Sequence, residues 1–331
     1  MASAHWRWPA EWESQTATLL AWPTPSSDWD EPQLSAAQNE FRCLIEQILN
    51  YQDVVLLQHP QDPPPTLPES SRLHRLSLPY NDTWCRDYGP LTLVDSGQRL
   101  ALDFTFAGWG GKYDATLDNR INEQLARQPL FEHFHFRQHR VELEGGAIDG
   151  DGQGTLLWNW HCLQQRFPDA SRGAIEQQLL ELFQAQRALA VDMPPLPGDD
   201  TDGHIDTMVR FIAADTLVYQ QHDEGWSSRL QQQLAAMRQP DGKPYRLVAL
   251  PRVTTPVSDA GRELPASYAN FLFINGALLV PAYGDPADQR ALEVLQPLAP
   301  DRQLISVPAQ AILHGNGSLH CCAMNLPAAL P

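Results

Sequence analysis

The sequence predicts an α/β protein built as a five-bladed α/β propeller, in which five similar units surround a pseudo-fivefold axis with their helices outside. Segments of helical period alternate with short apolar strands, and most of these strands are followed by a β-hairpin pattern. Polar or reactive residues also recur where the hairpins start, and such repetition is typical of stacked structural units. These residues are Asp87, Glu144, His204, Ser267 and Cys321, which stand 57, 60, 63 and 54 residues apart.

The helices are predicted from apolar residues three or four positions apart, such as Leu179, Leu182 and Phe183. A short apolar strand follows each of them. The helices are expected at 35–51, 121–134, 174–186, 227–238 and 287–298, and the strands at 54–58, 140–144, 188–193, 246–251 and 303–308.

The hairpins are predicted from pairs of β-rich runs that are split by a Gly, Asp or Asn turn. They are expected at 86–106, 144–160, 203–221 and 267–283. A last strand within 317–327 has no neighbour along the chain, and we expect it to pair with the early strand within 16–23. This pairing would leave the ring without exposed edges.

We therefore expect a single catalytic domain over 1–331, with the Pro-rich stretches 61–70 and 193–200 as connections between blades. An ordinary two-domain α/β protein is the alternative, because its strands and helices would alternate in the same way locally.

The composition predicts a soluble protein. Its acidic charge would favour encounter with a small cation, and the alternative is that the charge only keeps the protein soluble. The chain is 43% hydrophobic, has a mean hydropathy of −0.37 and contains no run long enough to span a membrane. Its net charge of −17 argues against a nucleic-acid partner. The N-terminus lacks the apolar core of a signal peptide, and five sparse cysteines suit a reducing compartment, so we expect a cytoplasmic protein.

The residues at the hairpin starts also predict a reactive site. In a propeller, Asp87, Glu144, His204, Asp206 and Cys321 would converge at one end of the axis. His204 and Asp206 are two positions apart on a predicted strand and would share one face. The turn at 315–317 contains two glycines and can aim Cys321 into a cleft. A cysteine thiolate is a nucleophile, so one candidate reaction is covalent catalysis.

Two carboxylates beside a cysteine suit a guanidinium substrate. Asp87 and Asp206 can accept its N–H groups and orient its central carbon toward Cys321. His204 would protonate the departing ammonia and then activate water, while Glu144 would orient His204. A zinc site is the alternative, but the tighter His/Cys spacing of zinc motifs is absent. On an extended strand, His320 and Cys322 would both point away from the axis.

Seven segments of the chain resemble, in order, those of the agmatine deiminase family within the guanidino-group-modifying (pentein) superfamily. They are WPAEWESQTATLLAWP, NDTWCRDYGP, GWGGKYDATLDNRIN, LEGGAIDGDGQGTLL, DTDGHIDTMVRFI, SYANFLFINGALLVPAYGDPADQRALEVL and GNGSLHC. The resemblance implies the five-bladed propeller, no metal or organic cofactor, and hydrolysis of a guanidine to a ureido group and ammonia.

The resemblance also implies roles for individual residues. Cys321 would be the nucleophile, His204 the acid and base, and Asp87 and Asp206 the ligands of the guanidinium. Glu144 would support them. Trp84 and Trp109 would line the substrate pocket.

We expect an agmatine deiminase of polyamine biosynthesis, which converts agmatine and water to N-carbamoylputrescine and ammonia. The residue that holds the substrate's amine is open, with Asp202 and Asp149 as candidates. A deiminase of free or peptidyl arginine is an alternative, and Lys112 or Arg210 would bind the carboxylate that an arginine substrate adds. An amidinotransferase and a catalytically silent binding module are further alternatives, and a homo-oligomer is compatible with the sequence.

Overall fold

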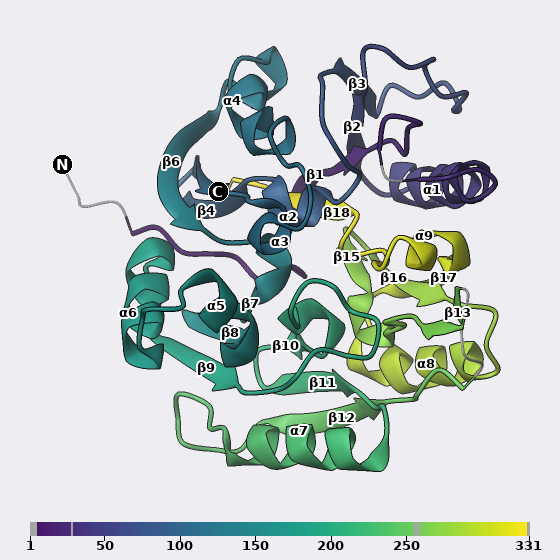
Figure 1. Cartoon of the computed structure of the whole chain (residues 1–331). Helices are drawn as coiled ribbons and strands as arrows, with labels where there is room; N and C mark the ends of the chain where they lie inside the picture. Colours follow the sequence, from purple (N-terminus) through teal and green to yellow (C-terminus); the bar gives the residue numbers. More distant parts are fainter. Residues whose placement is uncertain (1–4, 28, 255–257, 260, 330–331) are drawn as a thin grey trace.

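The computed structural model describes residues 5–27, 29–254, 258–259 and 261–329, and it shows an α/β fold of several small sheets (Figure 1). Five of the six sheets in this part of the chain share one pairing pattern, an antiparallel pair followed by a parallel pair. Four of them are β4 (Leu91–Asp95), β5 (Gln98–Thr105) and β6 (Phe134–Glu142); β7 (Ile148–Gly150), β8 (Thr155–Asn159) and β9 (Arg187–Val191); β10 (Val209–Ala213), β11 (Thr216–Gln220) and β12 (Arg246–Leu250); β15 (Leu272–Ile274), β16 (Ala277–Ala282) and β17 (Gln303–Pro308). The four predicted hairpins are thereby confirmed as antiparallel pairs.

The fifth sheet joins the two ends of the chain, as predicted. Its order is β18 (Ala323–Pro327), β1 (Gln15–Ala21), β2 (Asp53–Gln58) and β3 (Leu73–Ser77). β1 is antiparallel to β18, with Leu19 opposite Met324, and parallel to β2. The sixth sheet is the short pair β13 (Ser258–Asp259) and β14 (Arg262–Glu263). No sheet within the described residues closes on itself.

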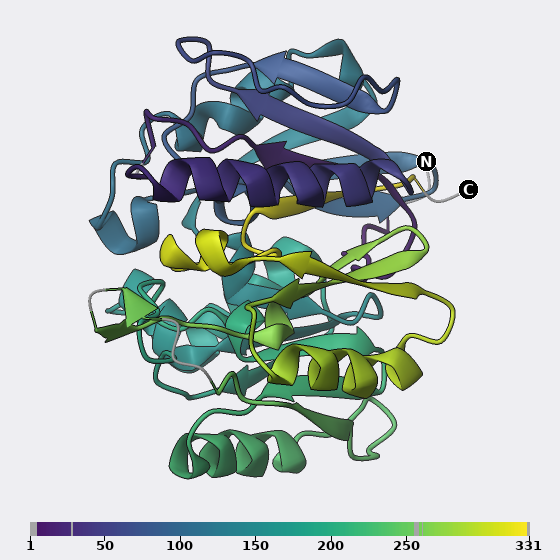
Figure 2. The same ribbon diagram turned by 90° about the vertical axis from the view of Figure 1, so that its right-hand side faces the viewer.

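The longer helices lie at the periphery of the molecule, around the sheets (Figure 1). Figure 2 shows α1 (purple), α8 (yellow-green) and α7 (green) one below another along one side. The α-helices are α1 (Gln33–Leu49), α2 (Cys85–Tyr88), α3 (Gly108–Gly111), α4 (Ile121–Leu125), α5 (Trp160–Arg166), α6 (Arg172–Phe183), α7 (Glu224–Ala236), α8 (Ala287–Leu295) and α9 (Gln310–His314). The 3-10 helices are η1 (Asp118–Arg120), η2 (Pro129–Phe131), η3 (Gly145–Ala147), η4 (Ile205–Thr207), η5 (Tyr268–Asn270) and η6 (Gln296–Leu298).

Four predicted helices are confirmed as α1, α6, α7 and α8, but the prediction at 121–134 is wrong over most of its length. α4 ends at Leu125 because Pro129 has no N–H to donate to the Leu125 carbonyl and its ring would clash there. In the described helices, none combines the length and the apolar character that crossing a bilayer requires.

Helices and strands are held by two clusters of buried apolar side chains, a large one and a smaller one around β10, β11 and α7. α1 buries one stripe of residues that are three or four positions apart, including Phe41, Leu44, Ile45 and Ile48. The middle strands are buried on both faces, so β8 is buried over its full length instead of alternating. This rigid packing fixes the positions of the loops that precede each sheet.

The residues predicted to start the strands lie instead in short turns before them. Asp87 belongs to α2, Glu144 caps η3, Asp206 belongs to η4, and Cys321 lies in the turn before β18. The strand placement predicted for His204 and Asp206 is therefore wrong. The sheet that contains β15 is preceded by a turn of the same kind, because η5 ends with Asn270 just before β15.

Candidate active site

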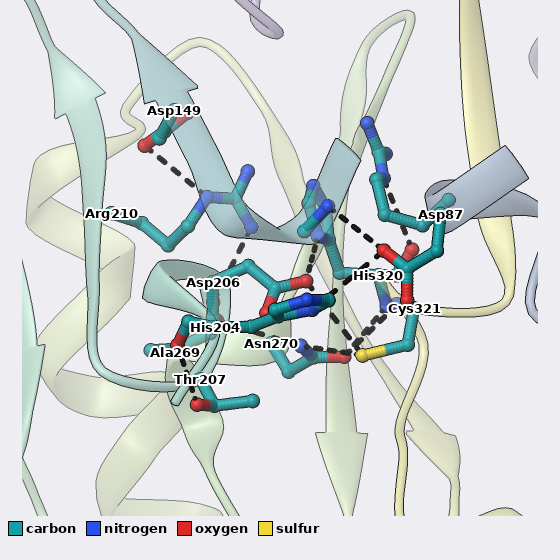
Figure 3. Close-up of polar contacts among 12 residues, drawn as sticks. Asp87, Asp149, His204, Asp206, Thr207, Arg210, Ala269, Asn270, His320 and Cys321 are labelled. Carbon is teal, nitrogen blue, oxygen red and sulfur yellow. Dashed lines mark hydrogen bonds and ion pairs between the residues drawn. The ribbon is translucent and has the colours of Figure 1, made fainter. Parts of the chain in front are cut away.

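Four residues singled out by the sequence, Trp84, Asp87, Trp109 and Cys321, line a cavity of about 400 Å³. The other three, Glu144, His204 and Asp206, lie buried beside it. Tight turns before separate sheets place them there, so side chains from distant parts of the chain face one another (Figure 3). The lining includes the aromatic residues Trp29, Trp84, Trp109 and Tyr113, the acids Asp82, Asp87 and Asp200, and Cys321.

Cys321 is 7% exposed, and its sulfur faces an amide and a carboxylate. The Asn270 Nδ2 group donates to Cys321 Sγ over 3.2 Å, and Asp206 Oδ2 lies 3.7 Å from the same sulfur. Asn270 Oδ1 accepts the backbone N–H groups of His320 and Cys321 at 2.9 and 3.3 Å. Burial raises the pKa of the Cys321 thiol well above its usual value, and the charges of Asp206 and Asp87 raise it further. The cysteine is therefore a thiol in this structure.

Asp87 is held by two donors. Its Oδ1 accepts the Gly146 N–H and its Oδ2 accepts the indole N–H of Trp109, both at 2.9 Å. The backbone of Trp109 has φ 54° and ψ 54°, a left-handed conformation that a bulky residue rarely adopts. Burial raises the pKa of Asp87 to about 6, against the lowering effect of His204. Asp87 is thus ionised at neutral pH.

His204 lies between two carboxylates. Its Nδ1 is 3.7 Å from Asp87 Oδ1 and its Nε2 is 3.8 Å from Glu144 Oε2. Burial alone would lower the pKa of His204, but the charges of Asp87 and Glu144 outweigh it and raise the pKa to about 9. The imidazole is therefore protonated at neutral pH.

Glu144 is tied to a second cation. Its Oε1 accepts a hydrogen bond from Arg166 Nε at 2.7 Å, and Arg166 Nη1 pairs with Asp202 at 2.7 Å. Burial would raise the pKa of Glu144, but His204 and Arg166 together lower it. Arg166 thus keeps a fully buried carboxylate charged beside His204.

Gly146 occupies the point where three functional groups meet. A Cβ at this position would lie 2.6 Å from His204 Nδ1, 2.9 Å from Asp87 Oδ1 and 3.0 Å from Asp206 Oδ2. These distances are shorter than van der Waals contact. A glycine is required here because no side chain fits between these groups.

The prediction that His320 points away from the axis is wrong. Its Nδ1 lies 2.7 Å from Asp206 Oδ2, and its Nε2 lies 3.0 Å from Glu11 Oε1. The alternation of a strand does not apply, because β18 begins only at Ala323 and the chain turns before it. Cys322 is fully buried in the hydrophobic core.

The structure brings Cys321, His204, Asp206, Asp87 and Glu144 together. It also places Trp84 and Trp109 in the cavity wall. Asn270, Arg166 and Glu11 were not predicted as site residues. Asn270 stands at the repeat-equivalent position of the fourth sheet, and a search that included uncharged polar residues would have found it.

The residues suggested for the far end of the substrate lie elsewhere. Lys112 pairs with Asp202 at 2.7 Å. Arg210 is buried against Glu11 and lies 3.3 Å from Asp149. None of the four suggested residues is found among the described residues that line the cavity. The acids that do line it, apart from Asp87, are Asp82 and Asp200.

In the described part of the chain, no cluster of His, Cys, Asp and Glu has the arrangement of a metal-binding set. Fold and site together define an α/β protein of repeated small sheets. A cysteine and a carboxylate line one cavity, and a charged histidine and two further carboxylates lie buried beside them.

The chain belongs to the Porphyromonas-type peptidyl-arginine deiminase family, whose model matches residues 7–327. It is 30% identical to the "Putative agmatine deiminase" of Vibrio parahaemolyticus, over 97% of this chain and 96% of that protein. Two solved structures share its fold with a TM-score of 0.88. The "Putative Arginine Deiminase" of Porphyromonas gingivalis is 39% identical over 98% of both chains. A Cys-to-Ser variant of the C. jejuni agmatine deiminase with substrate bound is 30% identical, over 100% of this chain and 99% of the other.

Proposed function

We propose that this chain hydrolyses a guanidine, and agmatine in particular, to a ureido compound and ammonia through a covalent amidino-cysteine at Cys321. The observation that carries the proposal is the position of the Cys321 sulfur. It lies 3.7 Å from Asp206, in the same cavity wall as Asp87, with the protonated His204 beside them.

Substrate binding would activate the cysteine. Asp87 and Asp206 would each accept N–H groups of the guanidinium. The cation would then offset the two charges that raise the pKa of Cys321, so that the thiol loses its proton to solvent. Asn270 would stabilise the thiolate through its donated hydrogen bond.

The thiolate would attack the central guanidinium carbon and form a C–S bond. His204 would give its proton to one amino group, which leaves as ammonia. Its departure yields a cationic amidino-cysteine. The neutral His204 would next take a proton from water while the hydroxide adds to the same carbon. The C–S bond would then break, the hydroxyl proton would return to sulfur, and the ureido product would form.

The cavity favours a substrate that carries a second positive charge at the end opposite the guanidinium. Asp82 and Asp200 line it together with four aromatic side chains, and aromatic faces attract cations. Lys112, which would have to bind a carboxylate, already pairs with Asp202 and donates to the carbonyl of the lining residue Asp200. Arg210, the other candidate, pairs with Glu11 outside the described lining. Agmatine, with its primary amine, fits this arrangement better than free arginine.

A deiminase of free or peptidyl arginine is the second candidate, because the matching family is described as peptidyl-arginine deiminase. A peptide would mask the carboxylate and remove the need for a basic residue. An amidinotransferase would share the covalent step and pass the amidino group to an amine. Small-molecule turnover with and without an added amine distinguishes these reactions.

We further propose that the five sheets are the blades of a five-bladed propeller, and that 1–331 is one catalytic domain. The shared pairing pattern, the turn before each hairpin and the pairing of β1 with β18 support this arrangement. In such a ring, the five turns meet at one end of the axis.

The proposed function is tested by ammonia release from agmatine, arginine and an arginyl peptide. We expect the wild-type protein to prefer agmatine and Cys321→Ala to release no ammonia from any of them. Cys43→Ala, at an exposed cysteine of α1, is the control and should match the wild type. Ammonia release by a folded Cys321→Ala protein contradicts the proposal.

A further inference from the structure

Three buried ionisable side chains, Asp206, His320 and Glu11, form a continuous series of contacts that starts at the Cys321 sulfur. Asp206 Oδ2 lies 3.7 Å from Cys321 Sγ and 2.7 Å from His320 Nδ1 (Figure 3). The other nitrogen of His320, Nε2, lies 3.0 Å from Glu11 Oε1. Asp206, His320 and Glu11 are all at most about a tenth exposed in their side chains. The mechanism proposed above uses only the first of these three residues.

Both ring nitrogens of His320 therefore face carboxylate oxygens. An ionised carboxylate only accepts hydrogen bonds, so a ring that donates to both of these oxygens is an imidazolium. The surrounding charges agree with this state. Arg86 and Arg210 pair with Glu11, and Asp149 faces Arg210. A cluster of Arg86, Arg210, His320, Glu11, Asp149 and Asp206 is electrically balanced only when His320 is charged.

His320 and Cys321 are successive residues, yet they line different cavities. Cys321 faces the large cavity, whereas His320, Glu11 and Arg86 line a second one of about 50 Å³ that does not include Cys321. Asp206 lies between the two residues. Its Oδ2 is held by His320, while its Oδ1 has no hydrogen-bonding partner in the part of the chain that the structure describes.

We propose that His320, as an imidazolium held by Glu11, is a positioning residue that keeps Asp206 ionised and oriented to bind the guanidinium beside Cys321. This inference rests on the proposed function. A fully buried carboxylate without a cationic partner would favour its neutral form, and a neutral Asp206 could not pair with a guanidinium. The lowered pKa of Asp206 agrees with this reasoning, since its contact with His320 opposes the effect of burial.

Other titratable and charged groups also face Asp206 and His320, and they contribute to the pH dependence of every variant. Asp206 is faced by His204, Cys321, Asp87 and Arg86 of α2, and Arg210 of β10; His320 is faced by Glu11 and Asp149 as well as Asp206. His320 is in direct hydrogen-bond contact with Asp206, so its removal should dominate the response.

The test compares His320→Asn with the wild type in the pH dependence of kcat/KM for agmatine. Asparagine keeps a donor near the position of Nδ1 but has no charge and does not reach Glu11. Loss of a close opposite charge raises a carboxyl pKa by about 1–3 units, which brings the pKa of Asp206 toward that of Asp87, about 6. The acid limb should therefore become steeper and move to higher pH, because two carboxyl groups then titrate in it. Glu11→Gln should move it in the same direction. The control is His59→Gln, at a buried histidine 3.6 Å from Asp62 and outside both cavity linings, and it should leave the limb in place.

A folded His320→Asn protein whose acid limb coincides with that of the wild type overturns the proposal, whatever its overall activity. If His320→Asn does not fold, His320→Gln takes its place in the same comparison. ¹⁵N NMR of the histidine rings gives a readout that is independent of turnover. Both nitrogens of His320 should carry protons at neutral pH, and a neutral ring overturns the proposal. A wild-type protein that turns over no guanidine refutes the proposed function instead, while NMR still reports the charge of His320.

Discussion

Replacing Trp109 by Phe would remove the indole N–H that Asp87 Oδ2 accepts at 2.9 Å, and would keep an aromatic ring in the cavity wall. The hydrogen bond stabilises the charged form of Asp87. Its loss should raise the pKa of Asp87, which burial already raises to about 6. Because the guanidinium needs an ionised Asp87, the acid limb of kcat/KM should move to higher pH.

The size of this shift follows from the strength of the bond. A hydrogen bond to a charged group contributes about 1.5–3 kcal/mol. Since one pKa unit corresponds to about 1.4 kcal/mol, the pKa should rise by about 1–2 units, to roughly 7–8. Activity at pH 7 should then fall by about two- to tenfold and recover to within about twofold at pH 8.5, where Asp87 is again ionised.

The assay is initial-rate ammonia release from agmatine between pH 5 and pH 9.5, compared for wild type, Trp109→Phe and Trp84→Phe. Trp84 lines the same cavity, but Trp109 provides the indole hydrogen bond to Asp87. Trp84→Phe should therefore change KM without moving the acid limb. A loss of activity in Trp109→Phe that is equal at pH 7 and pH 8.5 refutes this account of Asp87.

Three further variants probe the rest of the site. Gly146→Ala places a methyl group 2.6 Å from His204 Nδ1, and we expect kcat to fall by about 100-fold and the free energy of unfolding to fall by about 1–3 kcal/mol; near-normal kcat contradicts the crowding argument. Glu144→Gln removes a charge that raises the pKa of His204, so the alkaline limb, expected near pH 9, should move down by about one unit or more. The same variant leaves Arg166 without its buried partner, and chemical denaturation should show a loss of stability of about 3 kcal/mol. Cys322→Ser buries a hydroxyl in the core and should cost about 1–3 kcal/mol of stability with little change in kcat/KM; a large loss of kcat/KM would give Cys322 a role in the reaction.

Much of the fold follows from local patterns in the sequence. The stripe of α1 and the turn residues of the hairpins depend on neighbours a few positions apart, so periodicity predicts them. The helix predicted over 121–134 was wrong for a reason that is also local in the sequence. Pro129 is visible in the sequence and marks the point where α4 cannot continue.

The site was predicted only in part, because its geometry depends on turns and on distant partners. The spacing of His204 and Asp206 suggested a shared strand face, but η4 brings both to the site instead. His320 was misplaced for the same reason. Its partner Glu11 is more than 300 residues away, and no local pattern links a carboxylate in the N-terminal segment to the residue before Cys321.

The central claim is that Cys321 attacks the guanidinium carbon. The most direct measurement is intact-protein and peptide mass spectrometry after rapid acid quenching during agmatine turnover. We predict an adduct with the mass of the amidino group and its substituent on the peptide that contains Cys321, and its absence in Cys321→Ser. Steady turnover by the wild type with an adduct on a different residue, or turnover by Cys321→Ser at the wild-type rate, would contradict the claim.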